Sequence, residues 1–136
     1  MELINVENAK TQMRRGILEM CVLSIISREE MYPSDIIAQL KAANMLVVEG
    51  TLYPLLTRLK SAGFLNYRWV ESKSGPPRKY YHITPSGEHV KNELVKTWYE
   101  VVAAVETISQ HPANDEKNTL SINPITLMNV NKEALP

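Results

Sequence analysis

The sequence is poor in residues that could cross-link it. Its 136 residues include a single cysteine, Cys21, which has no partner for an internal disulfide. The neighbouring residues Met20, Val22 and Leu23 are apolar, so we interpret Cys21 as a packing residue rather than a reactive thiol. A reducing compartment suits such a chain.

Signals for membrane insertion and export are also missing. No stretch reaches the roughly 20 consecutive apolar residues of a membrane span. The first ten residues, MELINVENAK, contain two acids and no apolar core of the kind found in signal peptides. We therefore expect a cytoplasmic protein with no membrane partner.

The motifs of common enzymes are absent as well. The three histidines, His82, His89 and His111, do not share a metal-ligand spacing with Cys21 or with paired acids. The sequence has no Gly-rich phosphate loop, no nucleophile elbow and no isolated pair of carboxylates. We expect no catalytic residue, no metal and no cofactor.

Net charge is zero, but the positive charge is concentrated in one part of the chain. Residues 50–91 contain only two acids, Glu71 and Glu88, against seven basic residues: Arg58, Lys60, Arg68, Lys73, Arg78, Lys79 and Lys91. Such a local excess attracts a DNA backbone without making the whole protein basic.

The same region begins with a predicted amphipathic helix near Gly50. Its apolar face is formed by Leu52, Leu55, Leu56 and Leu59, at spacings i, i+3, i+4 and i+7. The opposite side carries hydrogen-bonding groups and no acid, and we take its residues as candidate DNA contacts: Thr51, Tyr53, Thr57, Arg58, Lys60 and Ser61. For Arg58 the alternatives are a guanine edge or phosphate, or an ion pair with an acid on the preceding helix; Tyr53 is either a contact or a structural residue.

A β-hairpin is predicted next, from Phe64 to Val70 and from Lys79 to Thr84, with Ser72 to Pro77 as its tip. We expect DNA contacts from Lys73, Arg78, Lys79 and Tyr80. Tyr80 and Tyr81 alternate across the strand, so one ring should enter the core while the other faces outward.

Two strings in this region, GTLYPLLTRLKSAGFL and GPPRKYYHITPSG, resemble the PadR family of bacterial transcriptional regulators. The resemblance covers roughly residues 10 to 110. It implies a mainly α fold with a small β-hairpin: a winged helix-turn-helix domain plus a long C-terminal dimerisation helix. It also implies a dimer that binds an inverted repeat in double-stranded DNA.

Other helices are expected from about Lys10 to Ser27, from Pro33 to about Asn44, and from Pro85 to about Gln110. A short connection from Met45 to Glu49 forms either a small strand or a tight turn. The predicted organisation is an N-terminal lead (1–9), a winged helix-turn-helix domain (10–84), a dimerisation helix (85–111) and a tail (112–136) without a recognisable motif.

The last helix carries an apolar seam with spacings of four, four, three, four and three: Val90, Leu94, Trp98, Val101, Val105 and Ile108. This pattern is close to a heptad repeat and predicts a homodimer with twofold symmetry. An alternative is that the helix folds back on the first helix of its own chain.

The resemblance further implies a small aromatic effector, because drug-responsive branches of the family have a tryptophan at the place of Trp98. Glu19, an acid among apolar residues, would favour a cationic ligand. The alternatives are dimer packing for Trp98 and a solvated or paired acid for Glu19. We expect a dimeric repressor released by such an effector; the alternative function is a winged-helix adaptor that binds protein and not DNA.

Overall fold

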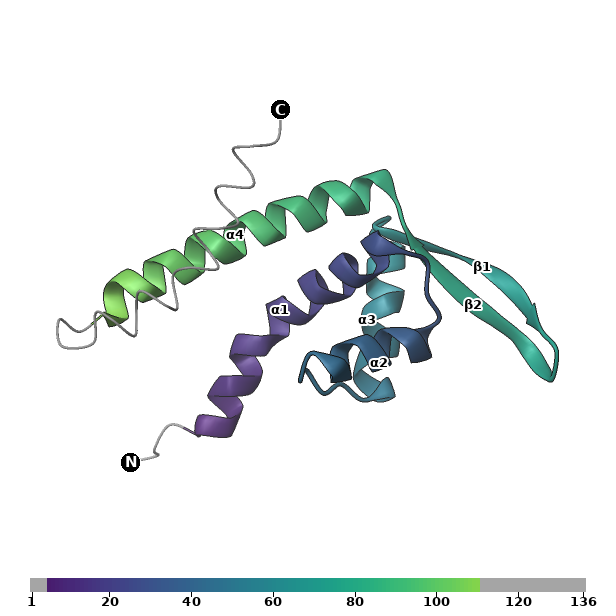
Figure 1. The fold of residues 1–136 in the computed structure, drawn as a ribbon, viewed down its shortest axis with the longest axis horizontal. Helices are drawn as coiled ribbons and strands as arrows, with labels where there is room; N and C mark the ends of the chain where they lie inside the picture. Colours follow the sequence, from purple (N-terminus) through teal and green to yellow (C-terminus); the bar gives the residue numbers. More distant parts are fainter. Residues whose placement is uncertain (1–4, 111–136) are drawn as a thin grey trace. The chain divides into compact units, whose positions relative to one another are not determined.

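The computed structural model describes residues 5–110, which form four helices and one hairpin (Figure 1). The elements are α1 (Val6–Arg28), α2 (Pro33–Ala42), α3 (Glu49–Ser61), β1 (Leu65–Ser72), β2 (Gly75–Ile83) and α4 (Pro85–Ser109). Residues up to Asn92 belong to one compact unit, and a second unit begins at Glu93, within α4. The mainly helical winged fold predicted from the sequence is confirmed.

The core of the first unit is made of leucine, isoleucine and valine side chains from three helices. Its members are Val22, Leu23, Ile25 and Ile26 of α1, Ile36 and Leu40 of α2, and Leu52, Leu55, Leu56 and Leu59 of α3, with Met31, Leu65 and Tyr81 closing it. All four leucines of the predicted apolar face of α3 are therefore buried. Each such side chain contributes about 1.5–3 kcal/mol on full burial.

The first helix begins earlier than the predicted Lys10. Asn5 caps it, since the Asn5 carboxamide oxygen accepts a hydrogen bond from the backbone N–H of Asn8 at 3.1 Å. An asparagine at this position satisfies a backbone donor that the helix leaves free, so the helix extends back to Val6. Residues 5–16 are exposed, and burial begins in the second half of α1.

The connection between α2 and α3 is a tight turn followed by an irregular segment, not a strand. Asn44 has a positive φ of 62°, and the N–H of Met45 donates to the carbonyl of Leu40 at 2.8 Å, which closes the end of α2. Residues 45–48 have no regular secondary structure, and Val48, which is extended, leads into α3 at Glu49. Leu46 and Val48 lie in this segment with most of their side-chain surface in solvent.

The hairpin is longer than predicted, and its turn is shorter. β1 and β2 are antiparallel, with Trp69 opposite Lys79 and Tyr67 opposite Tyr81. The turn is confined to Lys73 and Ser74, so Pro76 and Pro77 belong to β2 rather than to the tip. Prolines are accepted here because the register is irregular between Val70 and Ser72 and because each strand of a two-stranded sheet has an unpaired edge.

Backbone hydrogen bonds tie the hairpin to the helices. Met31 forms a bridge with Tyr81, with N···O distances of 3.1 and 2.9 Å. Figure 1 shows the hairpin extending away from α2 and α3. The bridge therefore fixes the base of the hairpin while its turn projects outward.

The start of α4 is held by Thr84 and Gly87. The Thr84 hydroxyl donates to the carbonyl of Gly63 at 2.6 Å and accepts from the N–H of Gly87 at 3.0 Å. Gly87 is buried, and a Cβ at this position would collide with the carbonyl oxygen of Phe64. Glycine is thus required here for close packing of α4 on the turn that follows α3.

A polar contact joins α1 to the first turn of α4. Ser27 donates a hydrogen bond of 2.6 Å to the carboxylate of Glu88, which also lies 3.3 Å from Lys91 Nζ. The bond from Ser27, supported by Lys91, lowers the pKa of Glu88 below its ordinary value. Glu88 therefore stays ionised at neutral pH, and its carboxylate continues to accept the hydrogen bond from Ser27.

From Glu93 onward α4 is a single helix with apolar residues on its surface. Val101 and Val105 are about half exposed, at 49% and 53%, and Ile108 is 82% exposed. Leu94 and Trp98 are partly buried. None of the described helices has the length and apolar content needed to cross a membrane.

Candidate nucleic-acid interface

The outward side of α3 is polar and fully accessible. All six candidate contacts predicted on this helix are exposed: Thr51, Tyr53, Thr57, Arg58, Lys60 and Ser61. The Thr57 hydroxyl donates to the backbone carbonyl of Tyr53 at 3.0 Å, which leaves its oxygen free to accept. The helix thus presents hydroxyls, an ammonium and a guanidinium without an acid after its first turn.

Arg58 has an ion-pair partner that the sequence did not indicate. Its Nη2 lies 3.4 Å from Glu19 Oε1, on α1 rather than on the preceding helix α2. Both side chains are largely solvated, with 63% and 42% of their surface exposed, so the pair is weak. The remaining guanidinium donors of Arg58 stay available to a phosphate or a base edge.

One face of the hairpin combines aromatic rings with lysines. Lys60 of α3 lies 5.3 Å from the centroid of the Tyr67 ring, and Lys79 of β2 lies 4.6 Å from the same centroid. Lys79 is also 5.5 Å from the ring of Trp69, which meets Tyr67 edge-on at 5.9 Å. We call Lys60, Tyr67, Trp69 and Lys79 the aromatic–lysine cluster. It joins the polar side of α3 to the hairpin.

Sequence reasoning missed this cluster. Tyr67 and Trp69 have the i, i+2 spacing of one strand face, which signals that they share a side. Their contact with Lys79 depends on the register of the hairpin, and the contact of Tyr67 with Lys60 depends on how α3 packs on β1. Neither can be read from the local sequence.

The other face of the hairpin is directed toward the start of α2. Arg78 donates a 2.8 Å hydrogen bond to the Ser34 hydroxyl, and its guanidinium lies 4.0 Å from the centroid of the Tyr32 ring. Tyr80 packs against the same Tyr32 ring at 4.7 Å. Arg78 therefore has a fixed position near the start of α2, and the residue remains exposed.

Of the two adjacent tyrosines, Tyr81 is the core residue, with 4% of its surface exposed. Burial raises the pKa of its hydroxyl, so Tyr81 stays neutral. Tyr80 is half-buried between Tyr32 and Arg68, whose guanidinium lies 4.9 Å from its ring. Arg68 is in turn bound by Glu30 at 3.0 Å.

The two remaining predictions about side chains on the first unit concern Lys73 and Cys21. Lys73 is exposed in the hairpin turn, where it can meet a phosphate. Cys21 is partly buried, and burial raises the pKa of its thiol. A protonated thiol is a poor nucleophile, in keeping with a packing role.

Comparison with known proteins places this geometry in a family. The model of the transcriptional regulator PadR-like family matches residues 22–93, which spans more than half of the chain. A PadR-like transcription factor from Bacteroides fragilis is 53% identical; the match covers 75% of this chain and 99% of that one, with a TM-score of 0.66.

Two further solved structures have the same fold. A PadR family transcriptional regulator from Eggerthella lenta is 35% identical, with 76% of this chain and 90% of that chain covered and a TM-score of 0.70. Bacillus subtilis PadR in complex with operator DNA is similar in fold at 22% identity and a TM-score of 0.55, over 58% of this chain and 46% of that one. This chain belongs to the PadR-like family of transcriptional regulators, and it is a winged-helix regulator rather than an enzyme.

Proposed function

We propose that this protein is a homodimeric, sequence-specific DNA-binding repressor. The observation that carries the proposal is the surface that runs from the polar side of α3 through Tyr67 to Lys79 on the hairpin. It carries basic and hydroxyl groups, and it combines one exposed helix side with the hairpin that follows that helix. A neighbour in fold, Bacillus subtilis PadR, is described in complex with operator DNA. Such a regulator works where the chromosome is, in the bacterial cytoplasm.

In this proposal α3 enters the major groove. Arg58 offers a planar pair of donors that suits the O6 and N7 atoms of guanine, or a phosphate. Thr51, Thr57 and Ser61 provide short hydrogen-bonding groups that set the register of the helix on the duplex. Lys60 and Tyr53 flank them, with Lys60 on the side nearest the hairpin.

The hairpin would act as the wing. Lys73 in the turn and Lys79 in the aromatic–lysine cluster supply charges for backbone phosphates beside the footprint of α3. Arg78 adds a third charge next to the start of α2, where Ser34 orients it. Tyr80 lies on this same side of the strand, and its hydroxyl is the natural group to reach a phosphate.

The dimer would form through the seam of α4: Val90, Leu94, Trp98, Val101, Val105 and Ile108. Exposed valine and isoleucine side chains on one helix favour a second apolar surface as their cover. Two copies related by a twofold axis would present two α3 helices about 34 Å apart, one turn of DNA. The operator would then be an inverted repeat.

The effector of the proposed repressor would be a flat aromatic cation that stacks on Trp98. Glu19 would favour a cationic ligand; in the structure its carboxylate lies 3.4 Å from Arg58, which corresponds to the alternative of a paired acid. A ligand changes DNA affinity only if it binds two arrangements of the dimer with different affinity. Release from DNA therefore requires a ligand that prefers the arrangement unable to span both half-sites.

Trp98 fluorescence tests the effector. The chain has two tryptophans, so Trp69→Phe leaves Trp98 as the only indole. Titration of this variant with planar aromatic cations should shift or quench its emission. If no such compound changes the emission, and Trp98→Leu retains normal effector-responsive DNA binding, Trp98 is not part of an effector site.

Selection from a random duplex library tests the central function. The full-length protein should enrich an inverted repeat, and fluorescence anisotropy should give an affinity for it that falls steeply with salt. A protein-binding adaptor built on the same fold would enrich no sequence and would show no salt-dependent DNA binding.

A further inference from the structure

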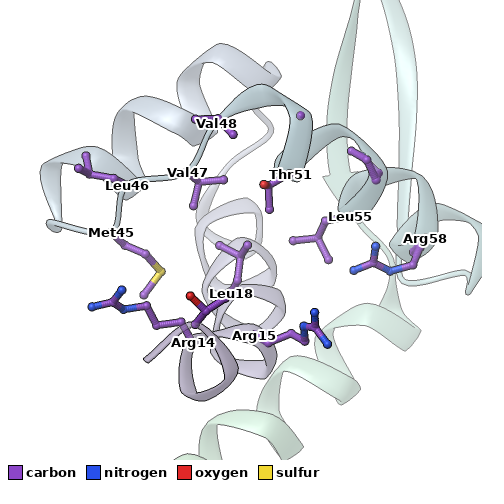
Figure 2. A pocket seen from close by; sticks show the side chains of 13 residues that line it. Arg14, Arg15, Leu18, Met45, Leu46, Val47, Val48, Thr51, Leu55 and Arg58 are labelled. Carbon is purple, nitrogen blue, oxygen red and sulfur yellow. The ribbon is translucent and has the colours of Figure 1, made fainter. Parts of the chain in front are cut away.

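A cavity of about 590 Å³ lies between α1, the segment that joins α2 to α3, and the first turns of α3 (Figure 2). Its volume is within the roughly 300–1,000 Å³ that small-molecule sites occupy. All of its walls belong to the first unit. The seam and the aromatic–lysine cluster contribute no residue to it.

Three guanidinium groups surround the cavity. Arg14 and Arg15 come from α1, where Thr11, Arg14, Arg15 and Leu18 share one helix face, and Arg58 comes from α3. In Figure 2, Arg15 and Arg58 extend toward each other, and Arg14 lies on the other side beside Met45. No acid is among the described residues that line the cavity, so the site is suited to an anion.

The walls between the arginines are apolar. They include Leu18, Met45, Val47, Pro54 and Leu55. Leu46 and Val48 also line the cavity, with 79% and 69% of their surface in solvent. An inorganic ion would leave this apolar surface in water, whereas an organic body would cover it. The three arginines and the apolar lining together indicate that the cavity suits an organic anion with an apolar body.

Arg58 connects the cavity to α3. Its only ion pair among the described residues is the weak, solvated contact with Glu19, so its guanidinium is free to turn toward a stronger acceptor. A carboxylate or phosphate can accept two parallel hydrogen bonds from a guanidinium, which a single 3.4 Å contact does not provide. An anion in the cavity would therefore compete with DNA for Arg58, and Thr51, another candidate DNA contact, also lines the cavity.

We propose that this cavity binds an organic anion, a carboxylate or a phosphate monoester on an apolar body, and that the bound anion weakens DNA binding by engaging Arg58. The binding itself is independent of the proposed function. The effect on DNA rests on the proposed function, since it requires that α3 contacts an operator.

Calorimetry of the full-length protein without DNA tests the binding. Octanoate and octyl phosphate are the probes, and octanol and inorganic phosphate are controls that retain only the apolar body or only the charge. At least one of the two probes should bind, and each control should bind at least about ten-fold more weakly. Absence of binding by both probes, or equal binding of inorganic phosphate and octyl phosphate, would overturn the proposal.

Two variants locate the site. Arg14→Ala/Arg15→Ala removes two charge-assisted contacts and should weaken binding of the probe about ten-fold or more. Val47→Trp keeps all three arginines but fills the cavity, and should also abolish binding. Lys41→Ala removes an exposed charge that does not line the cavity and should bind like wild type. Unchanged binding by both cavity variants, with wild-type circular dichroism, would overturn the assignment.

Anisotropy with a selected operator then tests the coupling. A saturating probe should weaken the DNA affinity of wild type by about five-fold or more. It should have no effect on the DNA affinity of Val47→Trp. Equal DNA affinity with and without a bound probe would overturn the coupling. A protein that binds the probe but no DNA at all would instead contradict the proposed function.

Discussion

Lys60 of α3 and Tyr67 of β1 form a cation–π contact, with the ammonium 5.3 Å from the ring centroid. The same ring receives Lys79 from the neighbouring strand at 4.6 Å. One aromatic side chain thus orients a lysine of the helix and a lysine of the hairpin. In the proposed complex both lysines are available to backbone phosphates.

Replacing Tyr67 tests this shared orientation. Tyr67→Leu removes the ring from both lysines, and each exposed cation–π contact stabilises by about 0.5–1 kcal/mol. We expect operator affinity to fall by roughly 1–2 kcal/mol if both contacts pre-orient their lysines. Tyr67→Phe keeps the ring and is the matched control. Equal operator affinities of the two variants, with equal thermal stability, would show that the ring does not serve DNA binding.

Replacing Arg58 tests the contact from α3. Arg58→Ala should weaken operator binding by roughly 1–3 kcal/mol and relax the preference at one base position if the guanidinium reads a base. Glu19→Gln, which removes only the partner of Arg58, should leave operator affinity equal to wild type or higher. Unchanged affinity of Arg58→Ala would remove this residue from the interface.

A charged side chain placed in the apolar seam of α4 tests whether this seam forms the dimer. Val101→Asp would place two like charges across the twofold axis in a desolvated position, which is strongly unfavourable. Sedimentation velocity should show monomers, and binding to an inverted-repeat operator should be lost with the dimer. Val101→Leu keeps the apolar contact and should remain dimeric. An intact dimer of Val101→Asp would refute this seam.

The contact of Ser27 with Glu88 predicts a pH dependence of stability. Because the pKa of Glu88 is lowered by folding, its contribution is present above the ordinary glutamate value and is lost as pH falls through the lowered one. Glu88→Gln should therefore melt below wild type at pH 7, and the difference should shrink as pH falls below the ordinary value of about 4.5. Glu93→Gln, at an exposed position, is the control. A difference that is constant from pH 7 to pH 3 would contradict this account.

Local sequence patterns were sufficient to predict the positions of the helices. The four leucines of α3 follow the helical repeat, and all four are buried because that repeat alone places them on one side. Pro33 and Pro85 correctly predicted the starts of α2 and α4, since proline is favoured in the first turn. The start of α1 was predicted four residues late. The helix is extended back to Val6 by one capping hydrogen bond to Asn5, which leaves no apolar pattern in the sequence.

Contacts between distant residues could not be predicted in the same way. Arg58 and Glu19 are 39 positions apart, and their pairing depends on the packing of α1 against α3. The aromatic–lysine cluster depends on a hairpin register set by a two-residue turn, and the prolines beside that turn suggested a longer tip. The cavity at Arg14, Arg15 and Arg58 likewise exists only once three separate segments are assembled.

The salt dependence of operator binding tests the central claim most directly. Affinity for the selected operator is measured by anisotropy over a series of salt concentrations. The proteins compared are wild type, Arg78→Ala/Lys79→Ala, and the control Lys41→Ala/Lys96→Ala. The two lysines of the control are exposed and lie outside the proposed interface. We predict a steep slope of log affinity against log salt for wild type and the control. For Arg78→Ala/Lys79→Ala we predict a slope lower by about two units, one for each lost phosphate contact. Equal slopes for all three proteins, or no salt dependence in wild type, would contradict a DNA-binding surface formed by α3 and the hairpin.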